Sequence, residues 1–176
     1  MIDKPSASEY APFYAGYISK APAGDVVELL DRQKDLVRRL SAATPAEQET
    51  FRYAAGKWSV REVAGHMTDA ERVFGYRAFR IARGDETPLE GFDENEFVAN
   101  STFHERSLSS LIDELVLVRD ANLAIFCGLS SEEWMRKGTA NGSPVSVRAL
   151  AFILVGHMHH HMDILRDRYG LKIDPK

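Results

Sequence analysis

The chain has 176 residues, of which 44% are hydrophobic and 27% are charged, and its formal net charge at pH 7 is −4. This length suffices for one domain with a hydrophobic core and is short for two. The acidic balance and the scattered basic residues argue against binding to a nucleic-acid backbone. No window holds about 18 uncharged apolar residues, and the first residues lack the pattern of a signal peptide. We therefore expect a cytoplasmic protein that binds neither nucleic acid nor membrane.

The cysteine content points to the same compartment. The single cysteine, Cys127, cannot form an internal disulfide, so the chain suits reducing conditions. Its apolar neighbours Leu123, Phe126 and Leu129 favour a small buried residue over a reactive thiol.

One arm and four amphipathic helices are expected in chain order. Residues 1–24 are rich in Pro, Ala, Ser and Tyr, which predicts an irregular arm packed on the body. Residues 25–176 are expected to form a single domain. Ser59 followed by Glu62 is typical of a capping box at a helix start. Apolar residues at helical spacing predict helices over about 25–40, 59–84, 107–127 and 146–169.

The connections between these helices are less regular. Residues 84–103 form a loop that is long for a compact domain and is expected to hold short helical turns. A further helical turn is expected over 131–135, and Asn141-Gly142 predicts a tight turn. We find no convincing alternation typical of β-strands. Four amphipathic helices without strands predict an all-α fold, a four-helix bundle.

Histidines gather in the last helix, where "VGHMHHHMDIL" holds four of the chain's six. Residues four apart on a helix lie about 40° apart around its axis, so His157 and His161 share a face. His160 lies about 60° from His157, and His159 lies on the opposite face. His157 and His161 continue an apolar stripe, so we expect both to point into the bundle.

Two imidazoles on a core face need polar partners, and a metal ion can satisfy both. His66 is the candidate for a third ligand, because it lies on the apolar stripe of the second helix between Val63 and Ala70. Three histidines leave at least one position for water or substrate, which is typical of catalytic metal sites. The alternative is that each imidazole is hydrogen-bonded and binds no ion. A zinc-protease HExxH motif is absent, since no glutamate stands between His157 and His161.

The stretches "KWSVREVAGHMTDAERVFGYRAFRIARGDETPLEGFDENEF" and "SVRALAFILVGHMHHHMDIL" resemble the DinB/YfiT-like superfamily, over about residues 25–169. The resemblance implies an up-down-down-up four-helix bundle, often dimeric, that holds a divalent metal with three histidines. On this chain those are His66, His157 and His161, and zinc or nickel is the implied metal. The sequence departs from the family at Met158, where relatives often have glutamate, and at Met162-Asp163, where they often have glutamine.

The leading hypothesis is a divalent-metal-dependent enzyme, a thiol S-transferase or a hydrolase, that activates a thiol or water. Its partners would be a small-molecule substrate, such as a low-molecular-weight thiol, and a second copy of the chain in a homodimer. Glu71, Arg77 and Asp93 are the candidate pocket groups, with His160 beside the ligands. The alternatives are a non-catalytic metal-binding stress protein and an interaction module on the same bundle.

Carboxylates next to His66 are candidates for orienting its ring. Glu62 lies one turn before it and Asp69 nearly one turn after, and either could accept an imidazole proton. The alternatives are a helix cap for Glu62 and a solvated face for Asp69. Glu71 lies farther round the helix and could instead pair with Arg77 or Arg148.

Overall fold

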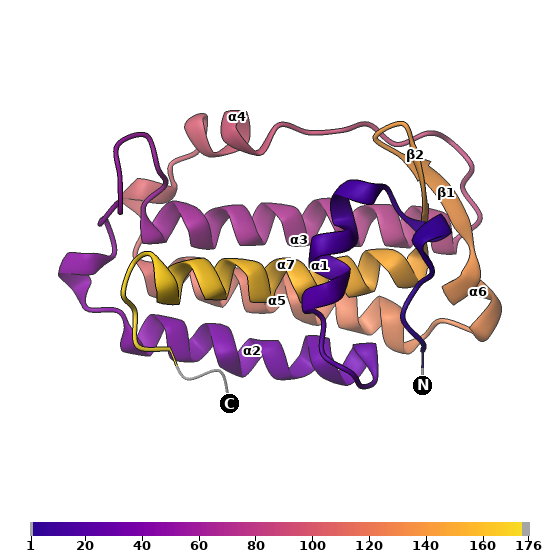
Figure 1. Ribbon diagram of the computed structural model, residues 1–176, viewed down its shortest axis with the longest axis horizontal. Coiled ribbons are helices and arrows are strands. Elements are labelled where there is room, and N and C mark those ends of the chain that lie inside the picture. The colour runs from indigo at the N-terminus through magenta and orange to yellow at the C-terminus, as the bar shows by residue number, and fades with distance from the viewer. Residues whose placement is uncertain (1, 174–176) are drawn as a thin grey trace.

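Four long helices form the body of the molecule in the computed structural model, which describes residues 2–173 (Figure 1). They are α2 (Val26–Ala43), α3 (Val60–Ala82), α5 (Leu108–Cys127) and α7 (Val147–Asp167). α2 and α3 each pack against both α5 and α7, so the order around the bundle is α2, α5, α3, α7. The chain between α3 and α5 runs back along the bundle, which makes these two helices parallel to each other (Figure 1). The all-α, up-down-down-up topology predicted above is confirmed.

Short polar side chains begin all four bundle helices. The Asp25 carboxylate accepts a hydrogen bond from the amide of the second residue of α2. Ser59, Ser107 and Ser146 each accept one from the amide of the third residue of their helix. Ser59 and Glu62 form the reciprocal capping box that the sequence predicts. These caps satisfy amides that have no partner within the helix, and they explain why the predicted helix starts lie within one residue of the observed ones.

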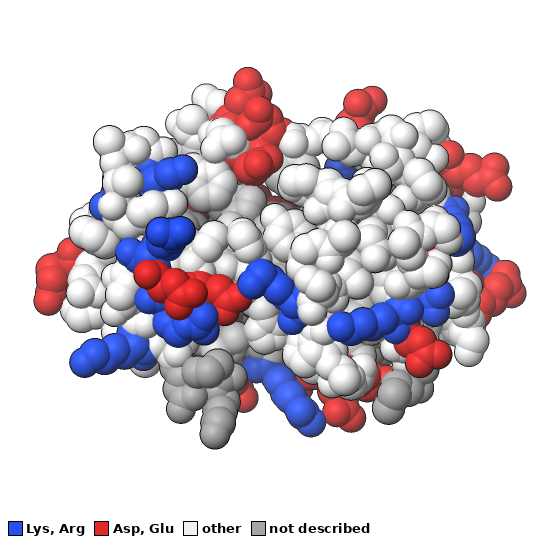
Figure 2. All heavy atoms as spheres, in the orientation of Figure 1, with Lys and Arg blue, Asp and Glu red and all other residues white. Residues whose placement is uncertain are grey.

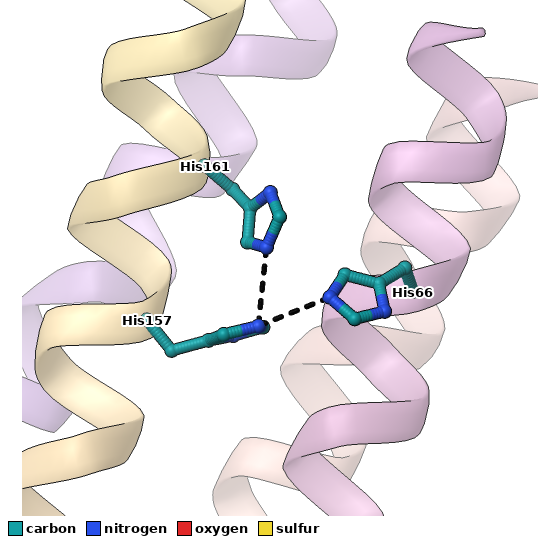
Figure 3. A group of neighbouring side chains, drawn as sticks. All are labelled: His66, His157 and His161. Carbon is teal, nitrogen blue, oxygen red and sulfur yellow. Dashed lines mark hydrogen bonds between the residues drawn. The ribbon is translucent and has the colours of Figure 1, made fainter. Parts of the chain in front are cut away.

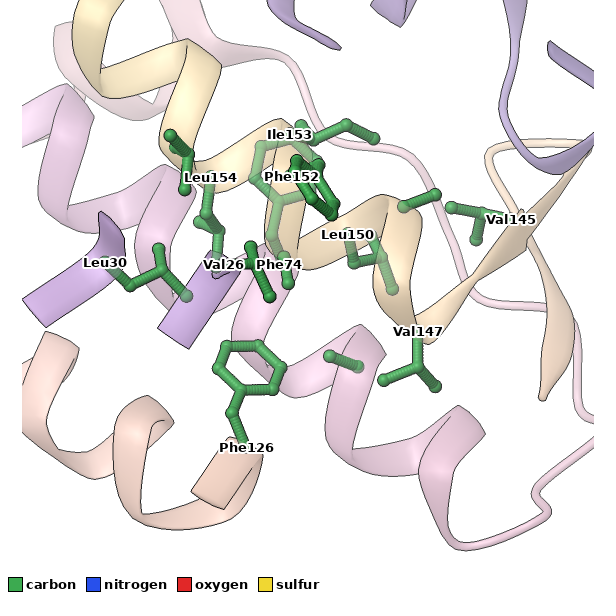
Figure 4. Close-up of a cluster of buried hydrophobic side chains, with 14 of the residues drawn as sticks. Val26, Leu30, Phe74, Phe126, Val145, Val147, Leu150, Phe152, Ile153 and Leu154 are labelled. Atoms are coloured by element: carbon green, nitrogen blue, oxygen red, sulfur yellow. The ribbon is translucent and has the colours of Figure 1, made fainter. Parts of the chain in front are cut away.

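The buried apolar side chains form two clusters, one toward each end of the bundle. One cluster joins the start of α2 and of α7 to the ends of α3 and α5, and Figure 4 shows Phe74, Phe126 and Phe152 among its members. The other joins the opposite halves of the same four helices. Between the clusters each helix contributes buried polar residues, so a polar layer crosses the middle of the bundle. They are Gln33, Glu71, Arg119, Asn122 and His157.

The N-terminal arm is more regular than the sequence predicted. It contains two 3-10 turns, Ala7–Glu9 and Pro12–Tyr14, and the helix α1 (Ala15–Lys20). α1 lies across α7, and buried Ile18 joins the first apolar cluster (Figure 1). Apolar and aromatic side chains that pack on the body therefore order the arm.

A β-hairpin corrects the expectation that the chain has no strands. β1 (Lys137–Ala140) pairs antiparallel with β2 (Ser143–Ser146). Asn141 and Gly142 both have positive φ, 50° and 70°, which is the geometry of the tight turn that their sequence predicts. Each strand has only four residues and few apolar ones, so the alternation that marks a strand is too short to recognise.

The remaining short elements lie in the connections. A 3-10 turn, Ala46–Gln48, follows α2, while α4 (Glu94–Ala99) and the turn Phe103–Glu105 lie in the long loop. The predicted helical turn after α5 is α6 (Ser131–Met135). Among residues 2–173, no helix combines the length and apolar character needed to span a membrane.

Cys127 corrects a second expectation. It is the last residue of α5, and its side chain is exposed rather than buried.

Candidate metal centre

Two neighbouring helices bring three imidazoles together, one of them, His157, in the polar layer of the bundle and two beside it. His157 and His161 lie one turn apart on α7, and His66 projects toward them from α3 (Figure 3). The Nε2 atom of His157 lies 3.0 Å from Nε2 of His66 and 3.1 Å from Nε2 of His161. One ring nitrogen from each of the three residues lies within 4.8 Å of the others. All three side chains are buried.

The contacts of His157 are difficult to satisfy with hydrogen bonds alone. A ring nitrogen of neutral imidazole either carries one proton or offers one lone pair. His157 Nε2 can therefore make one well-directed hydrogen bond, yet it faces two other ring nitrogens (Figure 3). Three lone pairs that point at one cation would satisfy all three nitrogens. Two nitrogens that each lie about 2.0–2.1 Å from one ion are roughly 2.9–3.4 Å apart, and the two spacings from His157 Nε2, 3.0 and 3.1 Å, lie in that range.

Burial keeps these imidazoles neutral, which is the form that binds metals. Removal from water lowers the pKa of His66 to about 4. The same desolvation, reinforced by the neighbouring histidines, lowers the pKa of His157 and of His161 well below the usual value. At pH 7 all three rings therefore offer a lone pair, and a metal would not have to displace a proton.

The three histidines form one wall of a cavity of about 500 Å³. The arm closes it on one side, and the long loop and the turn of the hairpin close it on another. His160 and Arg77, two of the candidates from the sequence, lie in its wall. The other lining residues are mostly aromatic or apolar: Ala11, Phe13, Tyr14, Tyr17, Trp58, Ala70, Phe74, Phe92, Glu94, Ala140, Asn141 and Ser143.

Glu71 and Asp93, the other two candidate pocket groups, are not among the residues that line this cavity. Glu71 is buried in the bundle and accepts hydrogen bonds from Arg119 and Asn122, so its partner is neither Arg77 nor Arg148. Asp93 caps α4, where its carboxylate accepts two backbone amide hydrogen bonds. Both carboxylates are therefore occupied in holding the fold.

The two carboxylates expected beside His66 are also placed away from its ring. Glu62 accepts hydrogen bonds from Ser59 and Arg52. Glu62 therefore caps α3, which was the alternative to its orienting the His66 ring. Asp69 faces Arg72 at 3.8 Å, and burial raises its pKa. Neither hydrogen-bonds to an imidazole in the described part of the chain.

Aromatic neighbours of the histidines were not predicted as cavity residues. The ring centroid of Trp58 lies 4.7 Å from that of His66. The Tyr17 ring lies 5.3 Å from His157 and 5.4 Å from His160. The arm's concentration of aromatics is the signal that could have found Tyr17, but no spacing rule connects it to a helix 140 residues away.

Comparisons with known proteins agree with this architecture. The family model of the DinB superfamily matches residues 28–165. A candidate metal-dependent hydrolase from Bacillus licheniformis is 31% identical over 116 residues, which make up 62% of this chain and 60% of that protein. The matched region thus spans less than two thirds of the relative's length.

Three solved structures share the fold. YfiT from Bacillus subtilis, described as a candidate metal-dependent hydrolase with an unusual four-helix bundle topology, matches with a TM-score of 0.75 at 18% identity, over 93% of this chain and 95% of that one. A mycothiol-dependent maleylpyruvate isomerase matches with a TM-score of 0.66 at 14% identity, over 83% of this chain and 62% of that one. The DinB-like protein YjoA from Bacillus subtilis matches with a TM-score of 0.58 at 18% identity, over 84% and 91%.

Proposed function

The chain belongs to the DinB superfamily, and from that premise we propose that it is a metal-dependent hydrolase whose ion is held by His66, His157 and His161. The observation that carries the proposal is the convergence of three neutral imidazole nitrogens at the wall of a cavity. Zinc and nickel both accept a set of three imidazoles. A divalent ion held this way lowers the pKa of a water or thiol bound to it, so that a nucleophile forms near neutral pH.

The chain's own residues would prepare the site for hydrolysis. Two helices fix the three rings, because His157 and His161 share one face of α7 and His66 lies about two turns inside the start of α3. The aromatic walls, with Trp58 beside His66 and Tyr17 beside His157, limit the access of bulk water and strengthen electrostatic interactions in the cavity. His160 lines the same cavity and is placed to exchange protons with a bound substrate.

Thiol transfer is the second candidate function. It is favoured by the shared fold of the mycothiol-dependent maleylpyruvate isomerase, whose name gives it a thiol cofactor. The cavity of about 500 Å³ is large enough for a small thiol and a second reactant. The same histidine set would serve, with a thiol in place of water.

Metal analysis and activity assays test the proposal together. The wild-type protein is expected to hold about one zinc or nickel ion per chain, and His157→Ala to lose it. His159→Ala is the matched control, because His159 lies on the same helix outside the cluster. The metal-loaded protein should hydrolyse a panel of small esters and amides, and the stripped protein should not.

The outcomes separate the alternatives. Transfer of a small thiol to an electrophile without ester or amide hydrolysis would favour the second function. A stoichiometric metal without turnover of either kind would favour a non-catalytic metal-binding stress protein. A wild-type protein that binds no transition metal would overturn both enzyme hypotheses and leave an interaction module.

A further inference from the structure

Arg77 is a buried cation without a carboxylate partner. Its side chain is 3% exposed, and its Nη2 donates a hydrogen bond to the backbone carbonyl oxygen of Glu90 at 2.6 Å. Its Cζ lies 5.7 Å from the ring centroid of Phe74 and 5.8 Å from that of Phe92. Within residues 2–173 no carboxylate forms an ion pair with it. A buried guanidinium with one hydrogen bond is unusual, because removing a charge from water is costly unless it is paired.

The equally buried Arg119 shows the contrast. Its Nε and Nη2 donate to the carboxylate of Glu71, and its Nη1 donates to the side chain of Gln33. Arg119 therefore has its counter-ion within the protein. Arg77 lacks one, so its remaining donors are available to a ligand.

The free donors of Arg77 reach open space. Among the described residues, every side-chain nitrogen or oxygen that is closed off from solvent has a hydrogen-bond partner. The Nε and Nη1 atoms of Arg77 have no hydrogen-bond acceptor in the described part of the chain, so each keeps a small contact with solvent although the residue is only 3% exposed. Arg77 lines the cavity that holds the three histidines, and this cavity is one place where its donors can meet a ligand.

Arg77 and His66 lie on the same face of α3. Eleven residues separate them, which is three turns and about 16 Å along the helix axis. Phe74 lies between: its ring is 5.7 Å from Arg77 Cζ and 6.2 Å from the His157 ring. Phe74 therefore neighbours both the guanidinium and the imidazole cluster. A small molecule that lies along the Phe74 ring in the cavity could contact both.

Negative charge elsewhere in the cavity limits what Arg77 can accept. Glu94 lines the same cavity, and its charge contributes, after burial, to the raised pKa of Tyr17. Acidic side chains gather over α4, the helix that begins with Glu94 (Figure 2). A single arginine next to these acidic side chains should bind a group with one negative charge more tightly than a group with two, because the second charge is repelled and has no cation of its own. The other lining side chains are mainly aromatic or apolar, so the body of the ligand should be apolar.

We propose that Arg77 binds the carboxylate of the substrate and that the substrate class is small aromatic or apolar monocarboxylic acids and their derivatives. The guanidinium fixes the acid group, the apolar walls hold the body, and the opposite end faces the three histidines. The reactive end rests on the proposed function, but the binding of the acid group does not. Arg77 is a specificity-determining residue in this assignment.

Binding of a simple acid tests the assignment. The probe is 3-phenylpropionate, and 3-phenylpropionamide is its neutral counterpart. We expect the wild type to bind the acid about 10- to 100-fold more tightly than the amide, which is the value of a charge-assisted hydrogen bond. Arg77→Met should bind the two equally. Arg80→Met is the matched control, because Arg80 lies one turn along α3 and is already paired with Asp85.

A separate measurement shows which of two cavities the probe occupies. Arg77 also borders a second hollow beneath residues 87–92, which contains no histidine. Trp58 lines the histidine cavity but not this hollow, so binding should change Trp58 fluorescence. Trp134→Phe removes the signal of the other tryptophan.

Four results would overturn the assignment. They are equal affinity of the wild type for acid and amide, undiminished acid binding by Arg77→Met, unchanged Trp58 fluorescence on binding, and tighter binding of phenyl phosphate than of the acid. Titrations in metal-free protein keep this test separate from the proposed function. Acid binding without any metal would leave the inference standing while the metal proposal fails.

Discussion

The carbonyl oxygen of Tyr17 lies against the α-carbon of Gly156, so close that a β-carbon there would be 1.8 Å from it. This contact lets α1 lie directly on α7, one residue before His157. We expect Gly156→Ala to push α1 away, because the clash is with backbone and cannot be relieved by a side-chain rotation. Overpacking of this kind costs about 1–3 kcal/mol. Urea unfolding should show the loss, and hydrogen exchange should accelerate in residues 15–20.

Gly16→Ala is the control for the same helix. A β-carbon on Gly16 meets nothing within 4 Å, and alanine is the better helix former. This variant should be as stable as the wild type or slightly more stable. Equal effects of the two substitutions would show that the approach of α1 to α7 does not hold the arm in place.

The buried ion pair between Arg119 and Glu71 gives a second prediction. Both side chains are 2% exposed and lie in the polar layer between the two apolar clusters. Arg119→Met leaves a buried carboxylate without its cation, which costs about 3–5 kcal/mol. The free energy of unfolding, measured by urea titration, should fall by that amount.

Two comparisons test this explanation. The double variant Arg119→Met with Glu71→Leu should recover much of the loss, because no unpaired charge remains. Arg38→Met breaks an exposed pair with Asp35 and should cost less than about 1 kcal/mol. A double variant no more stable than Arg119→Met would show that the lost hydrogen bonds to Gln33 and Leu30, rather than the charge, determine the effect.

Metal removal gives a third prediction, which depends on the proposed function. A ligand that binds only the folded state stabilises it, by about 4 kcal/mol at a thousand times its Kd. Chelation should therefore lower the melting temperature of the wild type. His161→Ala removes one of the three nitrogens, so its melting temperature should not respond to chelation. A response of equal size in the two proteins would place the metal elsewhere.

The bundle was predictable because its signals are local. Each long helix carries an apolar stripe and a Ser or Asp cap, and both are visible within about twenty residues. The pairing of His157 with His161 follows from helical spacing alone. His66 joined them because it lies on the inward face of its own helix.

The rest depends on contacts between distant segments. Nothing near Glu71 in the sequence indicates that its partner is Arg119, 48 residues away on another helix. The same holds for Tyr17, which reaches His157 only because α1 folds back across α7. These contacts determine which polar residues line the cavity, so the pocket was less predictable than the histidines.

Acid should weaken the attachment of the arm, because Glu9 holds the arm to the body. Its buried carboxylate accepts hydrogen bonds from Arg148 Nε at 2.8 Å and from Ser146 Oγ at 2.8 Å. The hydrogen bonds from Arg148 hold the pKa of Glu9 well below its usual range. In the unfolded chain the pKa is near 4. The stabilisation is thus complete above that pH and is lost as pH falls below it.

Comparison of the wild type with Glu9→Gln isolates this contribution from the other carboxylates. At pH 7 the variant should be less stable by on the order of 2–3 kcal/mol, since glutamine cannot replace the charge. The difference should shrink as pH falls from about 5 toward 2, because the wild type then loses the same charge. Melting temperatures of both proteins across this range measure it. Parallel curves for the two proteins would mean that Glu9 does not titrate in the way its partners imply, and that other contacts, such as the ion pair between Lys20 and Asp163, hold the arm.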